Sequence, residues 1–121
     1  MKKNILVADD SPTIRKFVSF TLSARGFKII SACDGMEALE KLPGEHIDLI
    51  ITDLNMPNVD GFEFIRTVRG NDEYNTIPII ILSSLGSEND IDEGLNCGAN
   101  SYLQKPFDPN RIAYEVSKYL N

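Results

Sequence analysis

The chain has 121 residues, of which 42% are hydrophobic and 25% charged, and its formal net charge is −6. These values fit one soluble globular domain, long enough for a core of its own but too short for two. The acidic balance argues against nucleic acid as the main partner, and no apolar stretch approaches the roughly 20 residues that a membrane helix needs.

The N-terminal residues and the cysteines indicate a cytoplasmic protein. The start Met1-Lys2-Lys3 is like the first part of a secretory signal, but the apolar run before Asp9 is only four residues long. A signal peptide needs about 7 or more. Cys33 and Cys97 are isolated and lack metal-ligand spacing. We therefore expect free thiols in a reducing compartment.

Strand patterns alternate five times with helical patterns along the chain. The strands are expected at residues 5–8, 28–32, 49–52, 79–82 and 101–104. The short apolar runs at 5–8 and 49–52 are typical of strands buried on both faces of a parallel sheet. The run at 28–32 is less apolar and is expected at an edge. This alternation predicts an α/β fold, doubly wound, with helices on both faces of a five-stranded sheet.

The expected helices begin at polar caps and end at glycine or proline. They run from Pro12 to Gly26, from Asp34 to Gly44, from Phe62 to Gly70, from Ser87 to Cys97 and from Pro109 onward. Ser11, Asp34 and Asp108 are the expected N-caps. The second helix carries an apolar stripe of Met36, Ala38, Leu39 and Leu42, and the last helix one of Ile112, Ala113, Val116 and Leu120. Gly94 lies inside the fourth helix and costs it roughly 1 kcal/mol relative to alanine.

Three aspartates follow the ends of two predicted strands. Asp9 and Asp10 follow the strand at 5–8, and Asp53 follows the strand at 49–52. Parallel strands bring these carboxylates to one edge of the sheet, where they repel and require a cation or a proton. Oxygen ligands of this kind suit Mg²⁺ with waters that a phosphate can replace. The pattern indicates metal-assisted phosphoryl chemistry, although Asp9 and Asp10 would alternatively cap the following helix, as Ser11 already does.

Four short motifs resemble those of the receiver domains of bacterial response regulators. The segments are Leu6–Asp10, Asp53–Pro57, Leu82–Ser84 and Lys105–Phe107, in the family's order and spacing over the whole chain. The likeness is to stand-alone receivers of the chemotaxis-regulator kind. It implies a flavodoxin-like sheet with strand order 2-1-3-4-5. It also implies that residues 1–121 form one receiver domain without an output domain.

The resemblance assigns a role to each polar residue at the sheet edge. It makes Asp53 the phosphoacceptor and Mg²⁺ the cofactor, with Mn²⁺ as a substitute. The metal would be held by Asp10 and Asp53 directly, by Asp9 through water, and by the backbone carbonyl of Asn55.

The remaining roles fall on three residues after the last two strands. Lys105, which precedes a cis bond to Pro106, would reach the phosphoryl group. Without the neighbouring motifs, the same lysine would be interpreted as a solvated surface residue. Ser83 would be the switch hydroxyl, favoured over Ser84 by register. Tyr102 would be the aromatic switch residue, or would only pack on an edge strand.

The implied function is a phosphorylation-activated signalling switch of a two-component system. A sensor histidine kinase would phosphorylate it, and an output protein would bind the face of the fourth helix, fifth strand and last helix. A monomer with only slow self-catalysed phosphorylation and dephosphorylation is expected, with no nucleic-acid or membrane partner. The alternative is a phosphorelay intermediate that passes phosphate to a histidine phosphotransfer protein; a phosphatase is a further expected partner.

Other interpretations depend on particular residues. A metal-dependent phosphatase usually has an aspartate two residues after its nucleophile, but Asn55 stands there and cannot protonate a leaving group. In a flavin-binding module, Asp9 and Asp10 would repel the phosphate. A phosphate-independent receiver would lack the acidic residues.

Asn55 and Leu85 are expected to tune the phosphoryl lifetime. The other polar residues that stand out are interpreted as solvated: His46, the acidic Glu88, Asp90, Asp92 and Glu93, and the basic Arg15, Lys16 and Arg25. For the three basic residues, docking of a kinase is the alternative.

Overall fold

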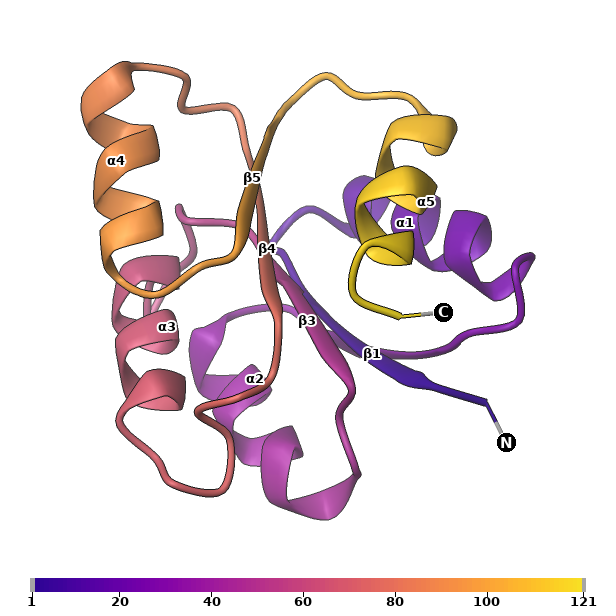
Figure 1. Cartoon of the computed structure of the whole chain (residues 1–121), viewed down its shortest axis with the longest axis horizontal. Helices are drawn as coiled ribbons and strands as arrows, with labels where there is room; N and C mark the ends of the chain where they lie inside the picture. The colour runs from indigo at the N-terminus through magenta and orange to yellow at the C-terminus, as the bar shows by residue number, and fades with distance from the viewer. Residues whose placement is uncertain (1, 121) are drawn as a thin grey trace.

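Five parallel strands form the sheet at the centre of the molecule, in the order β2-β1-β3-β4-β5 (Figure 1). The computed structural model describes residues 2–120. The strands are β1 (Asn4–Ala8), β2 (Lys28–Ala32), β3 (Leu49–Thr52), β4 (Ile79–Ser83) and β5 (Ser101–Gln104). The predicted strand order is confirmed, as is the edge position of β2. Ser83, expected just after the fourth strand, is its last residue.

The helices cover both faces of the sheet, as predicted. They are α1 (Pro12–Ser23), α2 (Gly35–Lys41), α3 (Gly61–Arg69), α4 (Glu88–Asn96) and α5 (Pro109–Ser117), with a 3-10 turn η1 (Leu42–Gly44) after α2. In Figure 1, α1 and α5 lie on one side of the sheet and α2, α3 and α4 on the other. Within residues 2–120, no helix has the length and apolarity needed to span a membrane.

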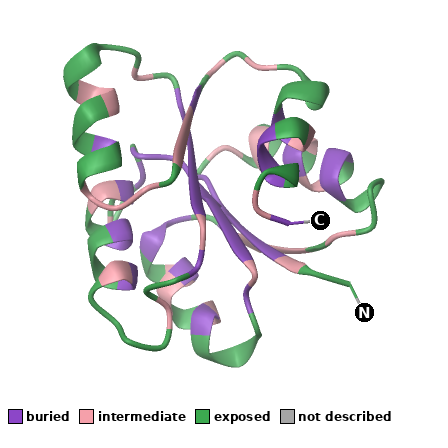
Figure 2. Ribbon diagram, in the orientation of Figure 1, coloured by how far each residue is buried: buried purple, intermediate pink, exposed green. Residues whose placement is uncertain are grey.

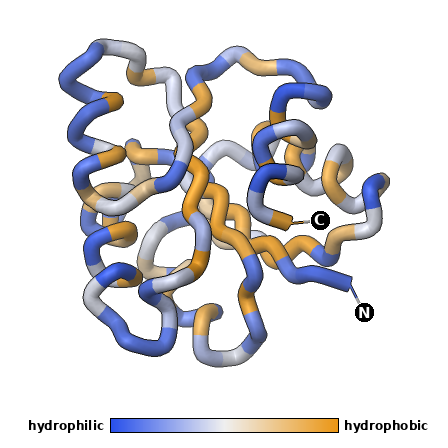
Figure 3. The backbone as a smooth tube through the Cα atoms, viewed as in Figure 1, coloured by the Kyte–Doolittle hydropathy of each residue, from blue (hydrophilic) through white to orange (hydrophobic). Residues whose placement is uncertain are grey.

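The side chains of the central strands divide between two apolar layers. In β1, Ile5 and Val7 pack with residues of α1 and α5, whereas Leu6 and Ala8 pack with residues of α2 and α3. The central strands β1, β3 and β4 are accordingly the most buried segments in Figure 2 and among the most hydrophobic in Figure 3. Burial on both faces explains why these strands are continuous apolar runs.

Three helix predictions need correction. The first helix ends at Ser23, before the expected Gly26, which follows in a turn with φ +94°. The last helix ends at Ser117, although Leu120 is still buried. Met36 is 49% exposed and does not join the buried stripe of α2. At 3.6 residues per turn, Met36 lies about 200° around the helix from Ala38, on the solvent side.

The fourth helix is confirmed, and its glycine has a packing role. A Cβ atom at Gly94 would lie 2.7 Å from Ile81 Cδ1 and 3.4 Å from the ring of Tyr102. Glycine therefore lets α4 lie close to β4 and β5, which accounts for a residue that disfavours helix. Among the four acidic residues of α4, Asp90 is partly buried and accepts a hydrogen bond from the Ser87 hydroxyl, so this carboxylate supports the helix cap.

Asp34 links the start of α2 to the loop after β3, which makes its contribution to stability pH-dependent. Its carboxylate accepts hydrogen bonds from the Glu37 amide (2.8 Å) and from the Asn58 side chain (2.7 Å). These bonds hold the pKa of Asp34 below its ordinary value of 3.8. The stabilisation is therefore present above pH 3.8 and lost as the pH falls through the folded-state value.

We expect Asp34→Asn to be less stable than the unsubstituted protein at pH 7, with the difference shrinking as the pH falls below about 3.8. Urea unfolding followed by circular dichroism between pH 7 and pH 2.5 measures both proteins under identical conditions. A difference in unfolding free energy that stays constant over this range would contradict the assignment.

Candidate functional site

The three aspartates singled out in the sequence meet at one edge of the sheet. β1 and β3 are neighbours, with Ala8 paired to Thr52, so Asp9 and Asp53 follow the two strands at the same level. The Asp53 amide donates to the Ala8 carbonyl over 2.9 Å. One carboxylate oxygen from each of Asp9, Asp10 and Asp53 lies within 4.8 Å of the others. Asp9 and Asp53 are buried, and Asp10 is exposed.

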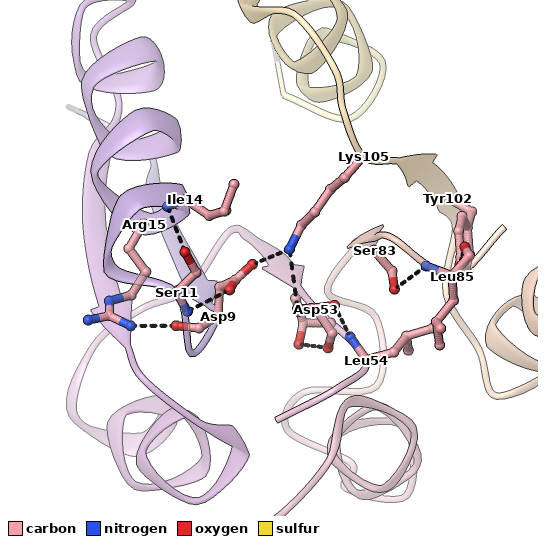
Figure 4. Close-up of polar contacts among 11 residues, drawn as sticks. Asp9, Ser11, Ile14, Arg15, Asp53, Leu54, Ser83, Leu85, Tyr102 and Lys105 are labelled. Carbon is pink, nitrogen blue, oxygen red and sulfur yellow. Dashed lines mark hydrogen bonds and ion pairs between the residues drawn. The ribbon is translucent and has the colours of Figure 1, made fainter. Parts of the chain in front are cut away.

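Lys105, which follows the edge strand β5 at the same edge of the sheet, bridges two of these carboxylates (Figure 4). Its Nζ donates to Asp9 Oδ2 over 2.9 Å and to Asp53 Oδ2 over 3.2 Å. The peptide bond to Pro106 is cis, as the resemblance implies. Burial opposes the lysine's charge, but the bonds and charges of Asp9 and Asp53 outweigh it and raise the pKa of the ammonium. Burial also raises the pKa of Asp9, despite its bonds from Ser11 and Lys105.

The cluster has the chemistry of a divalent-cation site. Three carboxylates face one ammonium, so a fully ionised cluster carries an excess of negative charge. The metal-ligand atoms are all carboxylate oxygens, and the Asp10 carboxylate is exposed to solvent, so the site suits Mg²⁺ with part of its water shell. Asp10 and Asp53 are the residues that would hold the ion, and Asp9 would lie beside it. The exposed Asn55 is two residues beyond Asp53, and a role for its carbonyl stays a prediction.

Ser83 and Tyr102 contact the same loop residue, Leu85. Ser83 Oγ is fully buried and accepts a hydrogen bond from the Leu85 amide over 3.2 Å. The Tyr102 hydroxyl donates to the Leu85 carbonyl over 2.5 Å, and partial burial raises the pKa of this phenol. Figure 4 shows both contacts on one side of Asp53. The backbone of Leu85 therefore connects Ser83 to Tyr102, the two predicted switch residues. This connection cannot be inferred from the sequence.

Two residues near the aspartates were missed. Arg15, interpreted as solvated or kinase-docking, turns inward, and its Nη1 donates to the Asp9 carbonyl over 2.6 Å. Gly61 begins α3 directly against the backbone of Asp53. The sequence shows the basic residue Arg15 on the first helix and the pair Asp60-Gly61. It does not show which backbone atoms Arg15 and Gly61 contact, because these contacts depend on the packing of the helices against the sheet.

The remaining sequence features lie outside the acidic site. His46 is on the loop before β3, is 85% exposed and lies 3.1 Å from Asp48. This loop is at the opposite end of the strand from Asp53, which agrees with its interpretation as a solvated residue. Cys33 and Cys97 are free thiols, as predicted.

Comparison with known proteins identifies the family. The family model for the response regulator receiver domain matches residues 5–117. The chain is 37% identical to the chemotaxis protein CheY1 of Helicobacter pylori over 118 residues, which cover 96% of this chain and 95% of CheY1. The structure of the chemotaxis response regulator CheY4 of Vibrio cholerae superposes with a TM-score of 0.93 at 38% identity, covering 99% of this chain and all of that one.

A third relative is a longer protein. The chain is 45% identical over 105 residues to the sensor protein EvgS of Escherichia coli O157:H7, which covers 87% of the chain but spans only 9% of EvgS. The fold and the acidic site thus define a signalling domain of two-component systems. The chain belongs to the response regulator receiver domain family, whose members interact with histidine kinases and output partners.

Proposed function

We propose that this protein is a phosphorylation-activated switch that receives a phosphoryl group on Asp53 from a sensor histidine kinase. The observation that carries the proposal is the convergence of Asp53 with two further carboxylates and Lys105 at one sheet edge. An Asp53 oxygen attacks phosphorus, the bond from phosphorus to the donor breaks, and its electron pair leaves with the donor. Bound Mg²⁺ would supply charge neutralisation between the carboxylate and the phosphoryl oxygens.

The contacts of Asp53 orient it for this reaction. Its Oδ1 accepts a hydrogen bond from the Leu54 amide over 2.7 Å, and Oδ2 accepts one from Lys105. The two bonds hold the carboxylate in one orientation before the donor arrives, which lowers the entropic cost of the attack. Once the phosphoryl group is in place, Lys105 donates to its oxygens as a point charge.

Phosphorylation then changes the loop after β4. Ser83 Oγ becomes a donor to a phosphoryl oxygen and draws the loop toward Asp53. Because the Leu85 carbonyl holds the Tyr102 hydroxyl, this movement also changes the position of Tyr102 and the surface of α4, β5 and α5. A complete shift between two states takes about 5 kcal/mol, and each charge-assisted hydrogen bond supplies about 1.5–3 kcal/mol.

The output is phosphate-dependent binding of a partner protein at the α4–β5–α5 face, of the chemotaxis type. The similarity to CheY1 and CheY4 along nearly their whole lengths supports this output. On α5, Tyr114 is 61% exposed and available for contact. The protein acts as a monomer with slow self-catalysed dephosphorylation, accelerated by a phosphatase partner.

A second candidate function is relay of the phosphoryl group to a histidine phosphotransfer protein. This candidate is favoured by the 45% identity with a segment of EvgS, because EvgS is a sensor protein and not an output protein. Transfer of label from the phosphorylated protein to a histidine phosphotransfer protein within seconds would select the relay. Retention of the label with capture of an output protein would select the switch.

Incubation with acetyl phosphate and Mg²⁺ is expected to add one phosphoryl group, detected by intact mass. Asp53→Ala and an EDTA-treated sample should remain unmodified, whereas the matched variant Asp72→Ala, at an exposed loop aspartate, should be modified normally. Modification of Asp53→Ala would refute the phosphoacceptor assignment. An unmodified parent protein would refute the proposed function.

A further inference from the structure

The Asp10 carboxylate depends on its backbone for its direction. It is exposed, and within residues 2–120 no hydrogen bond or ion pair involves it. Asp9 and Asp53, in contrast, are buried and each is bonded to Lys105. A side chain without its own partners samples several rotamers unless the main chain on either side restricts it. The position of Asp10 in the cluster therefore depends on how residues 9–11 are held.

Several hydrogen bonds hold this segment, and three of them bear on the backbone around Asp9. The Asp9 amide donates to the Ala32 carbonyl over 3.1 Å, and the Ser11 amide donates to Asp9 Oδ1 over 2.9 Å. Arg15 Nη1 donates to the Asp9 carbonyl over 2.6 Å. That carbonyl belongs to the peptide unit that leads into Asp10, so the arginine fixes the plane from which the Asp10 side chain departs. Figure 4 shows Arg15 reaching Asp9 from α1, on the side away from Lys105.

We propose that Arg15 is a positioning residue for the cation site, orienting the Asp9–Asp10 peptide so that the Asp10 carboxylate faces the metal. This inference rests on the proposed function, in which a divalent cation binds Asp10 and Asp53. Arg15 acts through a neutral carbonyl rather than a carboxylate, and the described part of the chain gives it no ion pair. Its neighbour Lys16 is exposed, and among residues 2–120 it makes no side-chain hydrogen bond or ion pair.

The sign of the effect separates positioning from charge. A guanidinium near the cluster repels a cation, so its loss would tighten metal binding if charge alone mattered. Loss of a positioning contact acts in the opposite direction, because Asp10 is then free to leave the cluster. Removal of a residue that orients a metal ligand typically weakens metal affinity about 10-fold or more.

The test compares Arg15→Met, Arg15→Lys and the matched charge control Lys16→Met. Free Mn²⁺ is measured by electron paramagnetic resonance, and Mg²⁺ binding by calorimetry. Arg15→Met is expected to bind both ions roughly 10-fold more weakly, with partial recovery in Arg15→Lys, which keeps one donor. Lys16→Met should bind as tightly as the parent or more tightly. The phosphorylation rate of Arg15→Met should approach that of the parent as Mg²⁺ is raised to saturation.

Urea unfolding in EDTA first checks that each variant is folded. If Arg15→Met is unfolded, the metal affinity of Arg15→Lys is compared with that of the parent instead. Equal or tighter metal binding by the folded Arg15 variants would overturn the positioning role while leaving the proposed function intact. A rate that stays low at saturating Mg²⁺ would also overturn it. Absence of metal binding by the parent protein would overturn both.

Discussion

Gly61→Ala is expected to destabilise the protein by about 3 kcal/mol and to weaken metal binding at the proposed cation site. A Cβ atom at this position would lie 2.1 Å from the Asp53 carbonyl oxygen and 2.6 Å from the Cα atom of Leu54. Both are backbone atoms, so the crowding cannot be relieved by a side-chain rotation. The chain must instead move α3 away from β3 or displace Asp53 and Leu54. The Gly61 amide, which donates to the Leu54 carbonyl over 2.9 Å, would be disturbed as well.

Urea unfolding measures the loss of stability, and Mn²⁺ binding measures the displacement of Asp53. Gly44→Ala is the matched control, because within residues 2–120 no atom beyond its chain neighbours lies within 4 Å of the Cβ that it would add. The control should retain the parent's stability to within about 0.5 kcal/mol. A Gly61→Ala variant with the parent's stability and metal affinity would show that the start of α3 does not fix the position of Asp53.

Lys105→Met is expected to cost about 2 kcal/mol of stability without metal. The lysine is the ammonium that bridges Asp9 and Asp53, and its removal leaves the buried Asp9 carboxylate without a cationic partner. The cost is smaller than for a fully buried ion pair because the lysine side chain is 18% exposed. Mg²⁺ should bind this variant more tightly than the parent, since no ammonium competes for the carboxylates.

The measurement is urea unfolding at pH 7 with EDTA and then with increasing Mg²⁺. In the proposed function Mg²⁺ binds the folded protein, so it should stabilise Lys105→Met more than the parent at equal concentration. Lys28→Met removes an exposed lysine that lies 3.6 Å from Glu45, and it should lose less than about 1 kcal/mol. If Lys105→Met loses no more than Lys28→Met, and Mg²⁺ stabilises it no further, then Lys105 does not balance the charge of the cluster.

The α/β class and the gathering of the carboxylates at one edge of the sheet were predictable from short-range patterns, whereas the strand order came from the family resemblance. Apolar runs such as 49–52 specify buried strands, and the alternation with helices specifies parallel neighbours. Parallel strands end at the same edge, so Asp9 and Asp53 had to lie close once β1 and β3 paired. The same rule places Lys105 at this edge, directly after β5, but its reach across β4 to Asp9 and Asp53 was implied by the family resemblance.

Helix faces were predictable where several apolar residues share the spacing of a turn, but less so near helix ends. Met36 was assigned to the buried stripe of α2 by its hydrophobic character, although its angular position places it on the solvent side. Gly94 was expected only to weaken its helix. Its actual contacts are with Ile81 and Tyr102, on two different strands, so the reason for a glycine could not be found within α4 itself.

The sequence by itself determined the order of the elements, the sheet edge that carries the chemistry and the residues that gather there, because periodicity and strand ends are local properties of the chain. The tertiary structure alone decided which side chains hold that edge in place. Arg15 reaches the Asp9 carbonyl, Gly61 packs on Asp53, and Leu85 joins Ser83 to Tyr102. These contacts depend on where a helix or loop comes to rest on the sheet, within a few tenths of an ångström, and that position is set by the packing of the whole core.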